Sequence, residues 1–200
     1  MTLTLRDVSR ALDGAWGLAF RDVQALTYFD FSEKGFWNSF WAAAIAAPLW
    51  LWLVLSQRTA SIEMAAAAGL ASDIPPLKLF LIAEGGAYLL SWFLFALMML
   101  PITKILQVPA RYAPYIITRN WAMVLVYFII ATPLTALENL GVFGPAAKAF
   151  LEPAAALVVL TYLWHITRLV LGITGVQAAA VILFDVLLSV FLSLVVVSIV

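Results

Sequence analysis

Four ionisable residues lie where the sequence is otherwise almost wholly apolar, and their side chains are the ones that could do chemistry. They are Arg119, His165, Arg168 and Asp185. An ionisable residue at membrane depth costs about 2.5–3.5 kcal/mol or more, so it normally faces a neighbouring helix and finds a partner. Counting about 1.5 Å per helical residue places all four in the same half of a helix bundle. We therefore predict an intramembrane polar cluster of these four residues.

Two interpretations of this cluster stay open. Helical spacing puts polar residues on one stripe of each of the two C-terminal apolar segments. The stripes consist of Thr161, Tyr162, His165, Arg168 and Gly172, and of Gln177, Asp185, Ser189 and Ser193. Facing each other, they would form a buried seam that conducts an ion, a proton or a polar substrate. The seam could instead be an Arg–Asp pair that fixes helix register, and we favour this structural interpretation.

Three carboxylates, Glu84, Glu138 and Glu152, lie near the other ends of three apolar segments. Carboxylates at similar depth could hold a cation. Glu138 and Glu152 are also close to the predicted water boundary, so solvated helix ends explain them more simply, and we predict no metal site. Glu84 precedes Gly85-Gly86, and this pair of glycines permits close helix approach or local unwinding.

Several catalytic chemistries are excluded by residue type. The chain has one His and no Cys, which rules out a two-histidine metalloprotease motif, cysteine zinc sites and thiol catalysis. Asp185 is the one aspartate at membrane depth, so an aspartyl dyad is absent. We predict that the protein is not an enzyme, has no catalytic residues and uses no cofactor.

The composition indicates which solvent surrounds these residues. Of 200 residues, 65% are hydrophobic and 11% charged, against roughly 25% charged in an average soluble domain. A soluble fold of this size could not hide so much apolar surface. The formal net charge is zero, so we expect no nucleic-acid partner. The sequence predicts an integral membrane protein, with the lipid bilayer as its partner.

The apolar stretches predict an all-α, polytopic membrane helix bundle. A span needs about 20 residues. Two glycines in Gly172-Ile-Thr-Gly175 divide the long C-terminal stretch into a helical hairpin. We predict five transmembrane helices within a domain over 36–200, or four if the second or third span only dips into the bilayer. The five spans cover about 36–55, 79–102, 112–137, 149–171 and 176–199.

Residues 1–35 differ from the rest of the chain. Apolar residues from Leu5 to Phe20 recur at helical spacing, and charged residues fall largely elsewhere on the wheel. This pattern predicts an amphipathic interfacial helix; the alternative is a helix packed on the ends of the spans. Ser32 is the expected N-cap of the first span. On the opposite side of the bundle, the sequence predicts a second short interfacial helix over Ile62–Ala68, which Gly69 ends.

Basic residues set the expected orientation. A cytoplasmic N-terminus places eight basic residues on the cytoplasmic side. They are Arg6, Arg10, Arg21, Lys34, Lys104, Arg111, Arg119 and Arg168. Arg58, Lys78 and Lys148 fall on the other side. We predict a multi-pass protein of the cell inner membrane, with the C-terminus opposite the N-terminus.

Tyr162-Leu-Trp-His-Ile, followed by Gly172-Ile-Thr-Gly175-Val-Gln-Ala, resembles the end of the fourth span and the next turn in the Yip1 family of small five-span membrane proteins. The resemblance covers spans two to five and implies a prokaryotic-type member. The Asp-Leu-Tyr-Gly-Pro and Gly-Tyr signatures of the eukaryotic members are absent. The family supplies no catalytic residues, and its eukaryotic members act in vesicle trafficking and bilayer shaping.

Two functions are expected from these observations. The first is a non-enzymatic membrane scaffold or organising component of Yip1-like type, which self-associates or binds other membrane proteins. The alternative is a small transporter or channel with a polar site around Asp185, Arg119 and His165.

Overall fold

The computed structural model describes residues 3–67, 69 and 74–199. Within these ranges the chain is helical and has no strand. The N-terminal elements are α1 (Leu5–Ala19), the 3₁₀-helix η1 (Val23–Tyr28) and α2 (Glu33–Ser39). The long helices that follow are α3 (Trp41–Ala67) and α4 (Leu77–Ile105). The short η3 (Pro109–Arg111) then leads into the second half of the chain.

The second half begins with one bent helical path. It consists of α5 (Tyr112–Leu125), a π-helical segment η4 (Val126–Ala131) and α6 (Thr132–Asn139). The hairpin of α7 (Pro145–Leu171) and α8 (Gly175–Ile199) completes the described chain. Gly172 has φ of 65° and ends α7 in the left-handed conformation, as the glycines of the predicted hairpin required.

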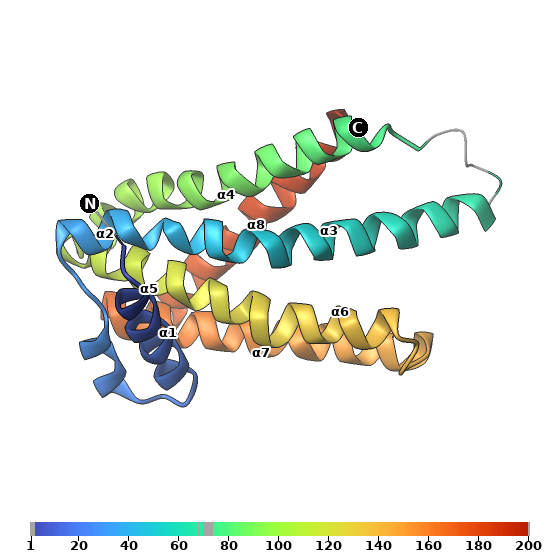
Figure 1. Ribbon diagram of the computed structural model, residues 1–200. Helices are drawn as coiled ribbons and strands as arrows, with labels where there is room; N and C mark the ends of the chain where they lie inside the picture. The colour runs from blue at the N-terminus through green and yellow to red at the C-terminus, as the bar shows by residue number, and fades with distance from the viewer. Residues whose placement is uncertain (1–2, 68, 70–73, 200) are drawn as a thin grey trace.

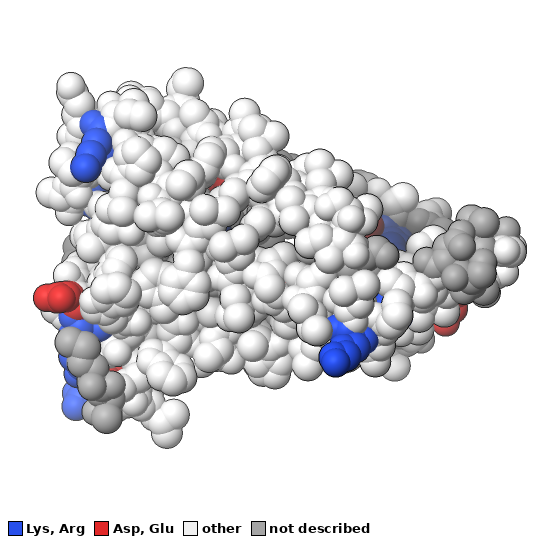
Figure 2. Space-filling model, turned by 90° about the horizontal axis from the view of Figure 1, so that it is seen from above, with Lys and Arg blue, Asp and Glu red and all other residues white. Residues whose placement is uncertain are grey.

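Among the described residues, five helices are long and apolar enough to cross a membrane, which is compatible with a multi-pass membrane protein. They are Glu33–Ala67, Leu77–Ile105, Pro109–Asn139, Ala146–Leu171 and Gly175–Ile199. The start of α2 and the end of α8 lie at opposite ends of the bundle (Figure 1). Charged side chains gather toward these two ends, and the face between them is almost free of charge (Figure 2).

The first long helix does not end where the sequence predicted. Leu55 was the expected end of the span, with a separate interfacial helix over Ile62–Ala68. The structure has one continuous α3 through Ala67, while Ala68 lies outside the described residues. Gln57 and Arg58 do not break the helix, because polar residues satisfy helical geometry as well as apolar ones do. Gly69, with φ of 75°, follows the helix end as expected.

The core centres on α5, where all residues from Tyr115 to Ala122 are buried. This helix packs against α1, α2, α3, α4 and α7, whereas α8 packs against α4 and α7. Aromatic side chains fill the contact of α3 with α4: the ring centroids of Trp50 and Tyr88 are 4.4 Å apart, and the Tyr88 hydroxyl donates to the Ala43 carbonyl at 2.6 Å. The central position of α5 makes it the helix that determines what any buried polar group contacts.

Helix α1 packs on η1, and with the segment that leads to α2 they form an N-terminal unit (residues 4–31) beside the end of the bundle where α2 begins (Figure 1). Thr4 and Asp7 form a capping box at the start of α1. The Ser32 side chain accepts from the Gly35 amide, which confirms it as an N-cap. Ala11, Ala15 and Leu18 of α1 are buried against the bundle and η1. The N-terminal unit is therefore packed on the spans, and its position relative to the membrane surface stays a prediction.

Candidate functional site

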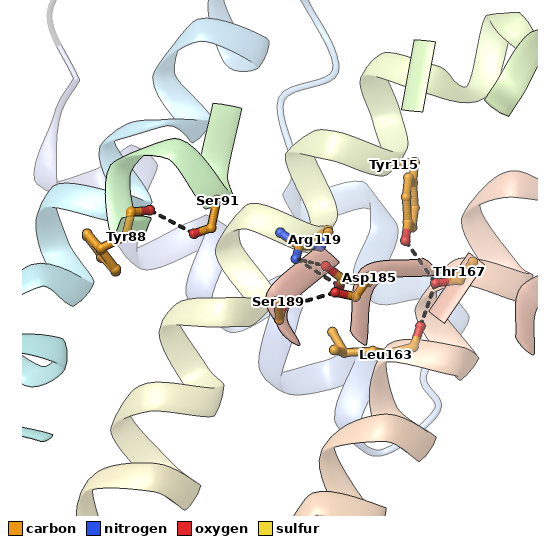
Figure 3. Close-up of polar contacts among 8 residues, drawn as sticks. All are labelled: Tyr88, Ser91, Tyr115, Arg119, Leu163, Thr167, Asp185 and Ser189. Atoms are coloured by element: carbon orange, nitrogen blue, oxygen red, sulfur yellow. Dashed lines mark hydrogen bonds and ion pairs between the residues drawn. The ribbon is translucent and has the colours of Figure 1, made fainter. Parts of the chain in front are cut away.

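Arg119 and Asp185 form an ion pair between α5 and α8, as Figure 3 shows. One guanidinium nitrogen, Nη2, donates to both carboxylate oxygens, at 2.9 Å to Oδ1 and 2.8 Å to Oδ2. The side chains are 10% and 13% exposed, so little solvent reaches either charge. Helix α8 packs on α4 and α7. The long side chain of Arg119 therefore connects α5 to α8 across this contact.

Neighbouring side chains hold the two charges in place. The Arg119 guanidinium carbon lies 3.8 Å from the centroid of the Phe95 ring on α4, so the cation also contacts an aromatic face. The Ser189 hydroxyl donates to the Asp185 backbone carbonyl at 3.0 Å. Within the described part of the chain, Arg119 Nε is buried without a hydrogen-bond partner. Three helices, α4, α5 and α8, thus meet at one neutral ion pair.

Two cavities reach this ion pair from different sides. A groove of about 440 Å³ between α7 and α8 is lined mainly by aliphatic side chains, with Ser189 and Ser193 on one wall. A smaller chamber of about 100 Å³ lies toward α4 and is lined by Ser91, Trp92 and Tyr127. The groove suits an apolar occupant, whereas the hydroxyls around the chamber suit water or another small polar molecule.

His165 and Arg168 do not join Arg119 and Asp185, so the four residues do not form a single cluster. His165 lines a separate cavity beside α1, together with Arg21. Arg168 is exposed, and its guanidinium carbon lies 5.6 Å from the centroid of the Trp164 ring. Helix α7 contacts α1 as well as α5 and α8, and His165 lies at its contact with α1.

The predicted seam between two polar stripes is also not formed. The Tyr162 hydroxyl donates to the Ala15 carbonyl of α1 at 2.7 Å, so its stripe faces the N-terminal unit. Gln177 accepts from the Thr174 amide at 3.0 Å at the start of α8, where it caps the helix. Only the part of the second stripe that runs from Asp185 to Ser193 lines a cavity with Arg119.

The three outer carboxylates are not gathered at one place. Lys148 of α7 pairs with Glu138 of α6 and lies 3.7 Å from Glu152, so a lysine takes the place that a cation would need. Glu84 lies on α4 in another cavity, beside Arg58. Among the described residues, His, Cys, Asp and Glu form no group that could hold a metal ion.

The Gly85-Gly86 pair neither brings two helices together nor unwinds α4. A Cβ added at Gly85 would meet Trp50 at 3.8 Å, an ordinary contact, and one added at Gly86 would meet nothing within 4 Å. Helix α4 continues from Leu77 to Ile105 without interruption. Glycine permits a close approach instead in the N-terminal unit, where a Cβ at Gly17 would lie 2.6 Å from the Cβ of Ala25, and in the α7–α8 hairpin, where one at Gly175 would lie 3.1 Å from Trp164.

Other buried polar contacts were not predicted. The Asn120 side-chain amide donates to Ser39 Oγ at 3.0 Å, and the hydroxyls of Tyr115 and Thr167 are 3.0 Å apart (Figure 3 shows the second pair). Asn120 follows Arg119 directly in an apolar stretch, and a polar residue inside a span is the signal that could have drawn attention to it. These contacts connect α5 to α2 and to α7.

Comparisons with protein-family models, with curated proteins and with solved structures found no match. The Yip1-like resemblance of the sequence is untested by them and stays a prediction.

Proposed function

We propose that the protein is a non-enzymatic inner-membrane component that organises the bilayer from one leaflet, as the Yip1-like resemblance implies. The observation that carries this proposal is the one-sided N-terminal unit. Its buried face is fixed to the spans, and its outer face presents large apolar side chains together with the charged Arg6, Arg10 and Asp13. The large apolar side chains that are at least 40% exposed are Leu5, Trp16, Phe20, Val23, Tyr28 and Phe31.

Such a unit acts as a wedge when it lies in the interface. Aromatic rings prefer the headgroup level, and an apolar helix face buries into the boundary between headgroups and acyl chains. The hydrogen bond from Tyr162 to Ala15 fixes the unit to α7, and α1 also packs against α5. The wedge therefore occupies area in one leaflet only, and the basic residues predict the cytoplasmic leaflet.

The ion pair supports a structural role for the bundle. Arg119 and Asp185 neutralise each other and connect two helices, so neither charge is left over for a substrate. We further propose that α8 is the surface for self-association or for other membrane proteins. It is the most apolar of the five long helices and the least buried one, with 22% of its most apolar stretch buried.

Vesicle imaging tests the proposal. The full-length protein is reconstituted into vesicles that contain phosphatidylglycerol, and vesicle diameters are compared with those of protein-free vesicles. We expect smaller vesicles with the native chain and a loss of this effect in Phe20→Gln. Phe150→Gln is the matched control, since Phe150 is 73% exposed on α7 and Phe20 is 70% exposed. Equal diameters with and without protein would contradict the proposal.

A second function, transport of a proton or small polar solute, is favoured by one observation: cavities of about 440 and about 100 Å³ meet at Asp185. Flux into proteoliposomes tests it, with Asp185→Asn as the blocked variant. Detectable flux that disappears in this variant would establish transport. Undetectable flux, or flux unchanged by the substitution, would remove this alternative.

A further inference from the structure

A cavity of about 390 Å³ lies between the end of α1, the π-helical segment η4 and α7. Ligand pockets typically have volumes of roughly 300–1,000 Å³. Its lining does not include Arg119 or Asp185, so it is separate from the ion pair. A π-helical segment is rare and often lies at a functional site, and here η4 forms one wall through Ile129.

One end of this cavity is polar and basic. Arg21 follows α1 and has φ of 63°, a conformation that residues other than glycine rarely adopt. His165 lines the same cavity, and its Nε2 is buried and has no hydrogen-bond partner within the described part of the chain. Buried polar atoms are nearly always paired, so the unpaired ring nitrogen of a residue that lines this cavity is a group that a bound ligand could satisfy.

The other end is apolar. Leu157 lies eight residues before His165 on α7, which is about 12 Å along a helix. Leu157, Val158 and Ile129 line this end and are also exposed at the outer surface of the bundle. Trp16 lies on the wall formed by α1 and is 48% exposed, as expected for an indole at the headgroup level.

We propose that this cavity binds one anionic phospholipid. Its phosphate lies between Arg21 and His165, where Arg21 supplies positive charge and the Nε2–H of the imidazole donates to a phosphate oxygen. One acyl chain runs along Leu157 and Ile129 toward the middle of the bundle. The described residues that line the cavity include no carboxylate, so its charge is complementary to that of the phosphate.

The basic residue at one end of the cavity and the apolar side chains at the other together indicate the class of ligand. A free phosphate ion would leave the apolar end of the cavity empty. A zwitterionic lipid would place the positive charge of its headgroup beside the positive charge of Arg21. This site goes beyond the proposed bilayer shaping, because a bound lipid does not require that the wedge bends the membrane. The two proposals can therefore fail separately.

Native mass spectrometry of the full-length protein in mild detergent tests the site. The protein is titrated with phosphatidylglycerol, with phosphatidylcholine and with inorganic phosphate. We expect one retained phosphatidylglycerol, preferred over phosphatidylcholine by about fivefold, a factor that corresponds to about 1 kcal/mol for one basic residue beside an anionic lipid. Arg21→Gln should abolish the preference, and Arg21→Lys should keep it.

Two matched controls make the result specific. Arg6→Gln removes the same charge from an exposed position in the first turn of α1 and should leave the preference unchanged. Leu157→Trp should fill the cavity and weaken binding of both lipids. Leu183→Trp places the same residue at a similarly exposed position of α8 and should not weaken binding.

Four results would overturn the proposal. They are equal retention of the two lipids by the native chain, equal losses in Arg6→Gln and Arg21→Gln, unchanged binding in Leu157→Trp, and displacement of the lipid by an equal concentration of inorganic phosphate. The last result would assign the basic end to a soluble anion.

Discussion

The Tyr162 hydroxyl of α7 donates a hydrogen bond at 2.7 Å to the backbone carbonyl of Ala15 in α1, which lies 147 residues earlier in the chain. The side chain of Ala15 is fully buried, so the carbonyl beside it has little access to water. This contact is a direct polar connection between the N-terminal unit and a long helix of the bundle.

Tyr162→Phe should loosen the N-terminal unit without unfolding the bundle. The net contribution of such a hydrogen bond is about 1 kcal/mol, which corresponds to roughly a fivefold larger open fraction. Amide hydrogen exchange at residues 15–18 measures the opening. Tyr28→Phe is the control because Tyr28 is 46% exposed. Equal exchange in the two variants would show that the contact does not hold α1.

Ser39→Ala should destabilise the protein by about 1–3 kcal/mol, because it leaves the buried Asn120 amide without its acceptor. Thermal unfolding in detergent gives the change in Tm. The double variant Ser39→Ala/Asn120→Leu should recover part of the loss, since it removes the unpaired donor. Ser198→Ala, at an exposed position of α8, should have almost no effect. A double variant less stable than Ser39→Ala would contradict this explanation.

Removing one member of the ion pair should cost more than removing both. Arg119→Leu or Asp185→Leu alone leaves a buried, unpaired charge, at a cost of about 3–5 kcal/mol. The double substitution replaces the pair by apolar groups, and we expect it to be more stable than either single variant. Denaturant unfolding of all four proteins measures the coupling free energy. Additive losses would show that the two charges do not interact.

Two glycine substitutions should have opposite effects on stability. Gly17→Ala places a Cβ 2.6 Å from the Cβ of Ala25 and forces α1 away from η1. Gly86→Ala meets nothing within 4 Å and should stabilise α4 by roughly 0.5–1 kcal/mol. Proteolysis of the N-terminal unit detects the first effect, and thermal unfolding detects the second. If Gly17→Ala is as resistant to proteolysis as the native chain, the packing of α1 on η1 is looser than described.

Acid should fray the start of α1. Hydrogen bonds from the Thr4 amide and hydroxyl lower the pKa of Asp7 below its ordinary value of 3.8. A lowered pKa in the folded state contributes stability above pH 3.8, and this stability is lost as the pH falls through the lower folded value. Hydrogen exchange at residues 5–8 should therefore increase below pH 4, after correction for intrinsic rates. Asp7→Asn should show no such change, and an identical increase in that variant would exclude Asp7 as the cause.

The features that the sequence could predict depend on composition over a whole helix or on the cost of a buried charge. Twenty apolar residues in a row identify a long helix whatever its neighbours are, and the partnership of Arg119 with Asp185 follows from the cost of leaving either charge alone. The end of α3 could not be predicted, because Gln57 and Arg58 are compatible with both a helix and a loop. Hydropathy marks where the apolar stretch stops and not where the helix stops.

The sequence of α7 alone could not show where the side chains of His165 and Tyr162 point. Their spacing shows that they share a side of α7, but the direction of that side is set by packing against α1 and α5. The sequence pattern predicted that α7 and α8 form a hairpin in which the polar stripe of one helix faces the polar stripe of the other. Tyr162 instead finds its acceptor in α1, at a contact that spans most of the chain.

The ion pair has a consequence for how the chain is made. Arg119 is synthesised 66 residues ahead of Asp185. At about 5–20 residues per second, the arginine waits roughly 3–13 s for its counter-ion. The Phe95 ring, which is made earlier and contacts the guanidinium in the finished fold, is a partner already present during that interval. Release of α8 from the ribosome therefore completes the charge balance of Arg119.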